Sequence, residues 1–216
     1  PSAENKPWTR WWWMGSAVDS ANITAELEQM SEAGFGGVEI TPIYGVKGQE
    51  AQNIPYLSPQ WMDMLAHTTA EAERLGMRVD MNHGTGWPFG GPQIEPKHAA
   101  SRLHIETWTV EDGKHFSRTL RSSTEFGDTL VYERKLIILT AYSGAGAVLN
   151  LLDSVDAEQR IDWEPPSGTW TIYAGYLGKT GQKVKRAAPG GEGLTVDHLS
   201  FDAVARYLKR FEPVLA

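Results

Sequence analysis

A short strand-like pattern occurs twice in the chain, each time soon after a glycine that ends a predicted helix. Residues 38–41 and residues 79–82 both place an acid between two apolar residues, and the preceding glycines are Gly34 and Gly76. From Arg10 onward, the sequence therefore alternates strand, helix, strand, helix, strand. This alternation favours an α/β architecture with parallel strands over a β-sandwich.

The predicted helices have recognisable boundaries. We expect the first helix to follow Asn22 as its N-cap and to bury an apolar stripe within residues 23–30. The second begins at Ser58, where a serine cap precedes a first-turn proline, and a third follows Ser200. The first two helices lead directly into the repeated strand pattern.

The acids within the repeated strands indicate the type of sheet. Because strand side chains alternate, the residues Glu39, Thr41, Asp80 and Asn82 point away from the surrounding helices. In a barrel that side is the lumen, whereas an open doubly wound sheet normally has apolar residues on both faces. We therefore predict an α/β fold in which the first three βα units form part of a (β/α)8 TIM-type barrel.

The middle of the chain has a different pattern. From about residue 102 to residue 177 the helical period is absent, and segments 103–110, 130–142 and 170–176 are typical of antiparallel strands. The sequence thus predicts an inserted antiparallel β module. The expected organisation is barrel units in residues 8–100, the β-rich module in 101–182, and a return to the barrel with the third helix in 183–216.

Aromatic residues and loops at the strand ends suggest a sugar site. Any one of the nine tryptophans is more typical of a core, but indole rings beside carboxylates suit the apolar faces and hydroxyls of a sugar. The glycine-rich residues 84–91 lack the Gly-Lys-Ser/Thr ending of a phosphate loop, so we expect a wide loop around a neutral ligand. The predicted substrate-binding residues are Trp12, Trp13, Glu39, Tyr44, Asp80, Asn82, Trp87, Lys185 and Arg186.

Two groups of these residues have an alternative interpretation. Glu39 and Asp80 suit either a functional pair or a structural pair neutralised by a Lys or Arg from elsewhere. Lys185 and Arg186 either lie in a solvated loop or return to the pocket rim, where they would hold hydroxyls or a carboxylate.

Composition excludes several classes of partner. With 216 residues and 41% hydrophobic content, the chain can bury a substantial core. Its net charge of -7 and the lack of a basic run argue against nucleic acid and against an anionic membrane surface. The absence of cysteine excludes disulfides and thiolate metal sites.

Several of these motifs, in this order, resemble glycoside hydrolase family 106, the α-L-rhamnosidases. The resemblance is carried by residues 10–15 with 17–19, 37–44, 56–61, 80–82 with 84–91, and 185–197. It implies a (β/α)8 barrel with accessory β domains, removal of terminal α-L-rhamnose with inversion, and calcium that binds sugar hydroxyls. It also implies a bacterial protein that is periplasmic or secreted, with a carbohydrate substrate.

The resemblance also sets expectations for the metal and for catalysis. Calcium prefers oxygen ligands, so Glu39, Asp80 and Asn82 are the candidate metal ligands. The catalytic acid and base of the family are expected on later barrel strands, beyond Ala216, so this chain is expected to be an inactive fragment. The alternatives are a non-catalytic carbohydrate-binding barrel fragment and a barrel glycosidase for a different sugar.

Overall fold

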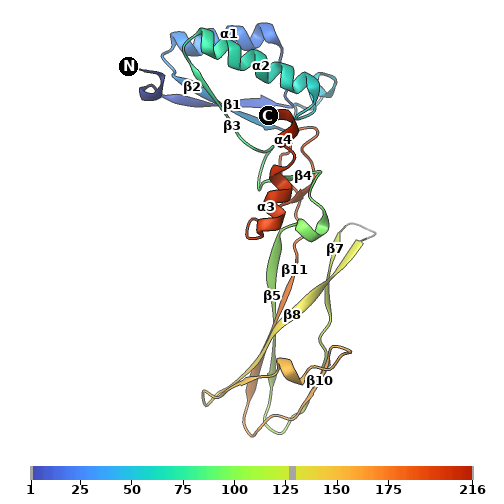
Figure 1. The fold of residues 1–216 in the computed structure, drawn as a ribbon. Helices are drawn as coiled ribbons and strands as arrows, with labels where there is room; N and C mark the ends of the chain where they lie inside the picture. Colours follow the sequence, from blue (N-terminus) through green and yellow to red (C-terminus); the bar gives the residue numbers. More distant parts are fainter. Residues whose placement is uncertain (1, 127–129, 216) are drawn as a thin grey trace. The chain divides into compact units, whose positions relative to one another are not determined.

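The computed structural model describes residues 2–126 and 130–215. The chain divides into two compact units, each with its own hydrophobic core (Figure 1). The first unit comprises Pro1–Ala99 and Gln182–Ala216, and the second comprises Ala100–Gly181.

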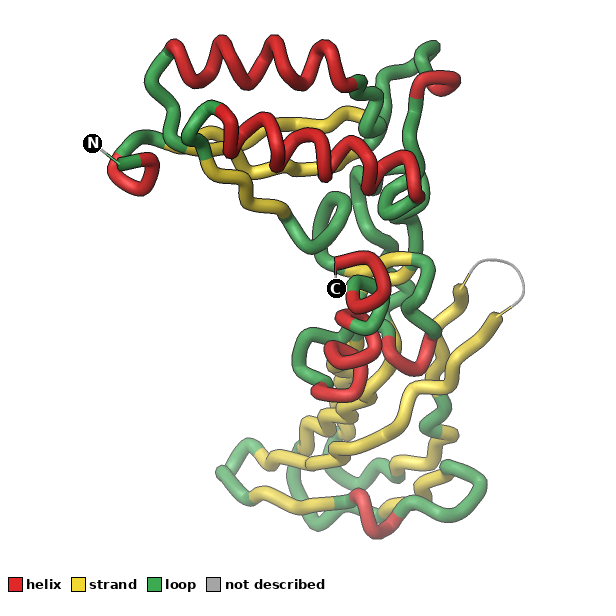
Figure 2. Tube along the Cα trace, turned by 45° about the horizontal axis from the view of Figure 1, so that its top comes forward, coloured by secondary structure: helices red, strands yellow, loops and turns green. Residues whose placement is uncertain are grey.

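A parallel sheet organises the first unit. Its strands lie in the order β1 (Trp8–Met14), β2 (Gly37–Ile43) and β3 (Arg78–Met81). The helices α1 (Ser20–Glu32) and α2 (Pro59–Arg74) cover one face of this sheet (Figures 1 and 2). The strand–helix alternation predicted for the first hundred residues is therefore confirmed.

The helix boundaries follow local capping chemistry. The Ser58 side chain accepts the Trp61 N–H at the start of α2, and Ser200 caps α3 (Phe201–Leu208), as predicted. The predicted cap of the first helix is wrong, because Asp19 rather than Asn22 accepts a backbone N–H there. Asp19 also accepts the Asn22 side-chain amide, so both residues stabilise the same turn.

Short elements complete the first unit around these helices. The strands β4 (Gly90–Gly91) and β12 (Leu194–Thr195) form an antiparallel pair, and α4 (Glu212–Leu215) is the last described helix. The 3-10 turns are η1 (Ala3–Asn5), η2 (Glu50–Gln52) and η3 (Pro96–His98). Among the described residues, no helix has both the length and the apolar character needed to cross a membrane.

The second unit is built on antiparallel strands. Its main sheet has the order β5 (Ser101–Val110), β11 (Trp170–Lys179), β8 (Leu130–Ser143) and β7 (Ser122–Phe126). The short β9 (Val148–Asn150) pairs with β8, and η4 (Leu152–Ser154) follows it. A separate pair is formed by β6 (Phe116–Thr119) and β10 (Arg160–Trp163).

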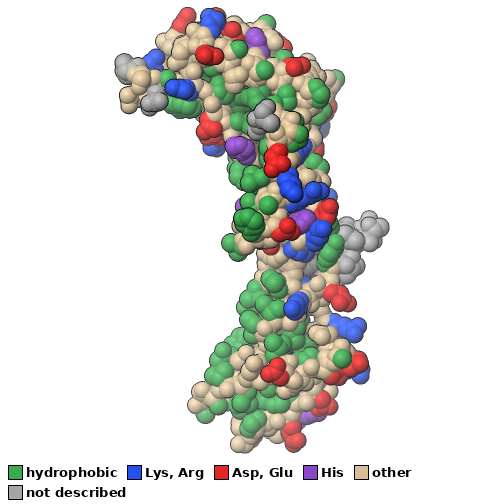
Figure 3. All heavy atoms as spheres, viewed as in Figure 1, with side chains coloured by type: hydrophobic (Ala, Val, Ile, Leu, Met, Phe, Trp, Pro, Cys, Tyr) green, Lys and Arg blue, Asp and Glu red, His purple; other side chains and the backbone are tan. Residues whose placement is uncertain are grey.

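The two faces of the main antiparallel sheet differ in exposure. One face buries residues such as Leu139 and Ile172, which have no exposed surface, and Trp170 closes the same core. The other face leaves apolar side chains in solvent, and hydrophobic atoms gather over this unit in Figure 3. These exposed residues are Leu103, Ile105, Ile138, Tyr142, Tyr173 and Leu177.

The predicted partial (β/α)8 TIM-type barrel is wrong. About 35% of the chain is strand and only 25% is helix. Among the described strands, only β1, β2 and β3 pair in parallel, and α3 follows a two-residue antiparallel strand rather than a barrel strand. The alternation of acids and apolar residues was misleading, because it marks any sheet with one uncovered face and not only a barrel lumen.

Candidate functional site

The sheet face opposite α1 and α2, which we call the open face, gathers polar and aromatic side chains. The register places Arg10 beside Glu39 and Glu39 beside Asp80, and it places Trp12 beside Thr41. Because side chains alternate along a strand, these residues share the face that the helices do not cover. Three neighbouring strands thus bring together residues that are far apart in sequence.

An ion pair neutralises the central carboxylate of the open face. Arg10 Nε donates to Glu39 Oε1 over 3.0 Å, and the Thr41 hydroxyl donates to the same oxygen over 3.1 Å. The Arg10 and Glu39 side chains are 47% and 34% exposed, so the pair remains accessible to solvent. Glu39 is therefore a charge-compensated acceptor that has further lone pairs available for a ligand.

Two indole rings form the apolar part of the site. The rings of Trp12 and Trp87 lie 6.0 Å apart in an edge-to-face arrangement, and the Arg10 guanidinium lies 5.5 Å from the centre of the Trp12 ring. Both tryptophans are about two-fifths exposed, at 46% and 38%. Rigid, half-exposed aromatic surface beside a hydrogen-bonding pair can contact a ring that has one apolar and one polar face.

Backbone pairing fixes the position of Trp87. The Trp87 N–H donates to the Lys185 carbonyl over 3.0 Å, and the Lys185 N–H donates to the Trp87 carbonyl over 2.8 Å. The preceding Gly86 has φ +89°, and a Cβ there would lie 2.1 Å from the Lys185 oxygen. Only glycine allows this close approach of the two loops.

The loop of residues 183–193 also contacts the end of β2. The Tyr44 N–H donates to the Arg186 carbonyl over 3.0 Å, and the Arg186 guanidinium lies 6.0 Å from the Tyr44 ring centre. Arg186 has φ +61°, which is uncommon for a residue with a side chain. The structure therefore places Lys185 and Arg186 beside two other predicted site residues, Trp87 and Tyr44.

A buried cluster anchors the same loop from the other side. Arg210 donates to the Gly190 carbonyl over 2.6 Å and lies against the Tyr56 ring. Burial lowers the pKa of Arg210 and raises the pKa of Tyr207 to about 12. Burial also raises the pKa of Tyr56, so the two phenols stay protonated around the guanidinium.

Trp13 does not belong to the site, which corrects its prediction as a substrate-binding residue. Its side chain has no exposed surface and packs edge-to-face against Trp11 at 5.8 Å and Trp61 at 5.6 Å. Since neighbouring side chains on a strand point to opposite faces, Trp12 and Trp13 cannot both line the open face. Trp13 is a core residue under the helices.

The residues predicted as calcium ligands do not form a metal centre by themselves. Glu39 is paired with Arg10, and Asp80 is exposed and accepts the N–H of its neighbour Met81 over 2.7 Å. In the described part of the chain, no three or more Asp, Glu or His side chains are placed to hold a metal ion. Asn82 adds one amide, which leaves the donor set below the six to eight oxygens that calcium takes.

Arg10 is a functional candidate that was not predicted as a site residue, and the fully buried Thr41 holds Glu39 beside it. Both lie on the open face and both contact Glu39. The sequence could have indicated them, because residues two apart on a strand share a face. Arg10 is two residues from Trp12, and Thr41 is two residues from Glu39. The pairing of Arg10 with Glu39 also requires the strand register, which is not visible in the sequence.

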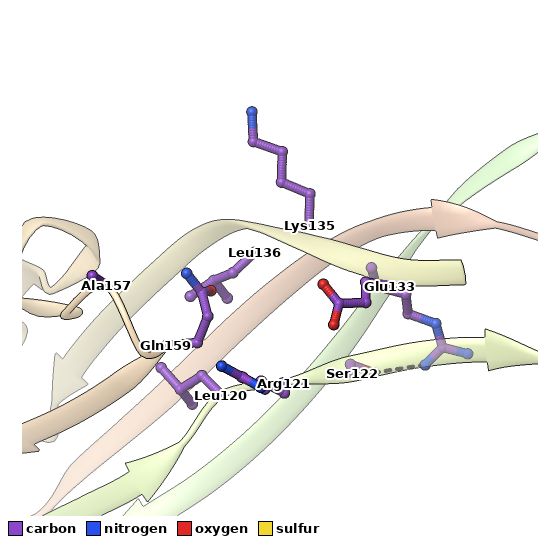
Figure 4. A pocket seen from close by; sticks show the side chains of 9 residues that line it. Leu120, Arg121, Ser122, Glu133, Lys135, Leu136, Ala157 and Gln159 are labelled. Atoms are coloured by element: carbon purple, nitrogen blue, oxygen red, sulfur yellow. Dashed lines mark hydrogen bonds between the residues drawn. The ribbon is translucent and has the colours of Figure 1, made fainter. Parts of the chain in front are cut away.

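A separate hollow of about 570 Å³ in the second unit lacks the features of a sugar site. Figure 4 shows that Lys135 points away from the other labelled side chains. The Arg134 guanidinium donates to the Ser122 hydroxyl over 2.9 Å. The residues that line this hollow include no aromatic side chain and none of the predicted site residues. The open face of the first unit is therefore the better candidate.

Comparison with known proteins assigns the chain to a class. Paired indoles beside a guanidinium–carboxylate pair offer one ligand both apolar surface and hydrogen-bonding groups. The family model of alpha-L-rhamnosidases, glycoside hydrolase family 106, matches residues 1–140 and 129–215. The chain belongs to this family of glycoside hydrolases, which confirms the resemblance seen in the sequence.

A curated relative and a solved structure agree in part with this assignment. A protein of Formosa agariphila named "Putative beta-glucuronidase" is 26% identical over 251 residues, which cover 100% of this chain and 21% of the relative. The structure of a rhamnosidase from Novosphingobium sp. PP1Y matches with a TM-score of 0.66 at 15% identity. That match covers 99% of this chain and 37% of the rhamnosidase, so the chain spans a minor part of both proteins.

Proposed function

We propose that this chain forms the sugar-binding part of a glycoside hydrolase that removes terminal α-L-rhamnose from glycans or glycosides. The observation that carries the proposal is the open face, where the Trp12–Trp87 pair lies beside the Arg10–Glu39 ion pair. Membership of the alpha-L-rhamnosidase family and the fold shared with a rhamnosidase support it.

The chemistry of the open face suits a deoxy sugar. The indole rings would contact the apolar C–H groups and the methyl group of rhamnose, while the Glu39 carboxylate accepts hydroxyl hydrogens. Arg10 would donate to a sugar oxygen without leaving its carboxylate partner, because a guanidinium has five N–H donors. These residues bind and orient the sugar in this proposal, and they do not transfer its protons.

Inversion of configuration is part of the proposal. It requires one carboxylic acid for the leaving oxygen and one carboxylate for water, about 6.5–9.5 Å apart. We assign neither role to a residue of this chain. The relatives are much longer than the stretch matched here, and we propose that their remaining sequence supplies the acid and the base.

Calcium and location remain proposals drawn from the family resemblance. Glu39, Asp80 and Asn82 supply oxygen donors of the right kind but too few of them, so a calcium site would need further ligands. Calcium titration of the protein in its full natural length, compared with an Asp80→Asn variant, tests the metal. A glycan substrate suits a protein that is secreted or periplasmic, which fractionation of the source cells tests.

A second candidate is a glycosidase for a β-glucuronide. The name of the Formosa agariphila relative favours it, because that protein is described by a different sugar. Hydrolysis of aryl α-L-rhamnosides and aryl β-D-glucuronides by the protein in its full natural length separates the two activities. Release from the rhamnoside alone supports our proposal, and release from the glucuronide alone contradicts it.

Binding by the chain itself is tested through its tryptophan fluorescence. We expect rhamnose to change the emission of the 216-residue chain and expect Trp12→Ala and Trp87→Ala to abolish the change. Trp8→Ala is the matched control, because Trp8 is 42% exposed on the same strand but donates to Ala3 at the far end of the sheet. If all three variants respond like the unmodified chain, the site is wrong. Binding without hydrolysis by the full-length protein would favour a non-catalytic carbohydrate-binding role.

A further inference from the structure

Positive charge gathers at the open face of a chain that is acidic as a whole. The net charge is -7, yet the Arg10 guanidinium lies against Trp12, the Arg186 guanidinium lies against Tyr44, and Lys185 pairs with Trp87 through the backbone. Glu39 balances Arg10. Within residues 2–126 and 130–215, neither Lys185 nor Arg186 has a carboxylate within ion-pair distance.

The Lys185 side chain lies on the same side of the loops as the Trp87 ring. The two residues are directly opposite each other in an antiparallel bridge. Directly opposite residues in an antiparallel pair present their side chains to the same face. Since the Trp87 ring packs against Trp12, the Lys185 side chain leaves the loop on the same side as this aromatic pair.

The backbone of this basic pair is held in place and is not a free loop. Lys185 exchanges two hydrogen bonds with Trp87, the Arg186 carbonyl accepts from Tyr44, and Val184 donates to Gly193 over 2.9 Å. The left-handed conformation of Arg186 is maintained by these contacts. A strained backbone that the surroundings hold in place is a feature that clusters at ligand sites.

We propose that Lys185 and Arg186 bind an oxyanion of the saccharide that occupies the Trp12–Trp87 pair, so that the substrate class is an acidic glycan. The inference rests on the proposed sugar-binding function. The shared chemistry is a singly charged oxyanion, which a uronic acid supplies as a carboxylate and a sulfated sugar supplies as a sulfate ester. Arginine and lysine both bind such groups, arginine in a two-pronged geometry.

The acids of the open face do not oppose an anion at this position. The charge of Glu39 is compensated by Arg10 at 3.0 Å. Asp80 lies on β3, and β2 separates that strand from Trp12 on β1. The anion would therefore bind at the end of the site where Lys185 and Arg186 lie, while neutral hydroxyls contact Glu39.

Calorimetric titration of the 216-residue chain tests this proposal with matched saccharides. The first pair is α-L-rhamnosyl glucuronic acid and its neutral methyl ester, and the second pair is methyl rhamnoside with and without a sulfate ester. We expect the charged member of at least one pair to bind about tenfold more tightly at low salt. The preferred pair identifies the source of the oxyanion, and the preference should shrink in 0.5 M salt because surface ion pairs are screened.

Two charge-matched variants test whether Lys185 and Arg186 cause the tighter binding of the charged sugar. In Lys185→Gln/Arg186→Gln, the charged and neutral sugars should bind with equal affinity. The control Lys114→Gln/Lys209→Gln removes the same charge from exposed positions elsewhere and should keep the preference. Equal binding of charged and neutral sugars by the unmodified chain would overturn this inference alone. Failure to bind any of the four sugars would overturn the proposed sugar site as well.

Discussion

Three consecutive tryptophans on β1 have two different roles because strand side chains alternate between faces. Trp11 and Trp13 are buried under the helices, whereas Trp12 lies on the open face with 46% of its surface exposed. Trp11 also donates to the Glu26 carboxylate on α1 over 2.8 Å. The residue type is the same at all three positions, so only the face of the strand distinguishes a core residue from a candidate ligand contact.

This difference predicts opposite effects on stability and binding. Trp13→Ala should lower the free energy of unfolding by about 3–5 kcal/mol, because it leaves a cavity between Trp11 and Trp61. Trp12→Ala should lower it by less than about 1 kcal/mol but abolish the response to sugar. Urea unfolding of both variants measures the difference. Equal losses of stability would show that Trp12 is also a core residue.

The buried phenol of Tyr207 predicts a loss of stability at high pH. Burial raises its pKa to about 12, above the value of about 10 for an unfolded tyrosine. The contribution to stability is therefore complete below about pH 10 and is lost as the pH rises toward 12. Between these values the free energy of unfolding should fall by about 1–2 kcal/mol more in the unmodified chain than in Tyr207→Phe. Guanidinium unfolding at several pH values compares the two chains, and parallel curves would contradict the assignment.

At the scale of elements, the site depends on loops that meet from distant parts of the chain. The loop after β3 carries Trp87, and residues 183–193 pair with it through the backbone. Gly86 allows this contact, because a side chain at that position would meet the Lys185 carbonyl. The geometry of the site is therefore a property of loop packing as much as of the sheet.

A pair of glycine substitutions separates the close contact from the backbone conformation. Gly86→Ala and Gly34→Ala both put alanine at a similar positive φ, +89° and +92°, but only Gly86 has neighbours within reach of the added Cβ. The positive φ should lower the free energy of unfolding of both variants by about 1 kcal/mol. The steric contact should lower that of Gly86→Ala by at least about 2 kcal/mol more. Thermal unfolding compares the variants. Similar losses would mean that the two loops can separate without cost.

For the whole molecule, the second unit has the features of an independently folding insertion. The chain enters and leaves it at adjacent points, because Ser101 pairs with Lys179 in the sheet and the Thr180 N–H donates to the Ala100 carbonyl over 2.8 Å. Its core is separate from that of the first unit. Removing such a segment leaves two ends that lie close together.

We therefore expect residues 100–181, expressed alone, to unfold cooperatively. Near-ultraviolet circular dichroism during heating measures this, because Trp170 packs inside the core and is edge-to-face with Trp163. Ile172→Asp should abolish the transition, since Ile172 has no exposed surface, whereas Ile105→Asp, at a position 62% exposed, should retain it. A fragment without a cooperative transition would show that its core needs the rest of the protein.

The sequence by itself determined the local structure and the family. Helix caps at Ser58 and Ser200, the alternating strands of the first unit and the antiparallel segments of the second were all visible, because they depend on side chains close together in the chain. The linked motifs were sufficient for the assignment to the rhamnosidase family.

Only the tertiary structure decided how the sheets close and which residues share a surface. Three features depend on contacts between segments up to about a hundred residues apart. They are the register that pairs Arg10 with Glu39, the burial of Trp13, and the contact of Lys185 with Trp87. Periodicity shows that a strand has two different faces, but it does not show what lies against each of them. For this reason, the alternation of residues in the sequence suggested a barrel lumen. In the structure, the same side chains lie on the open face of a three-stranded sheet.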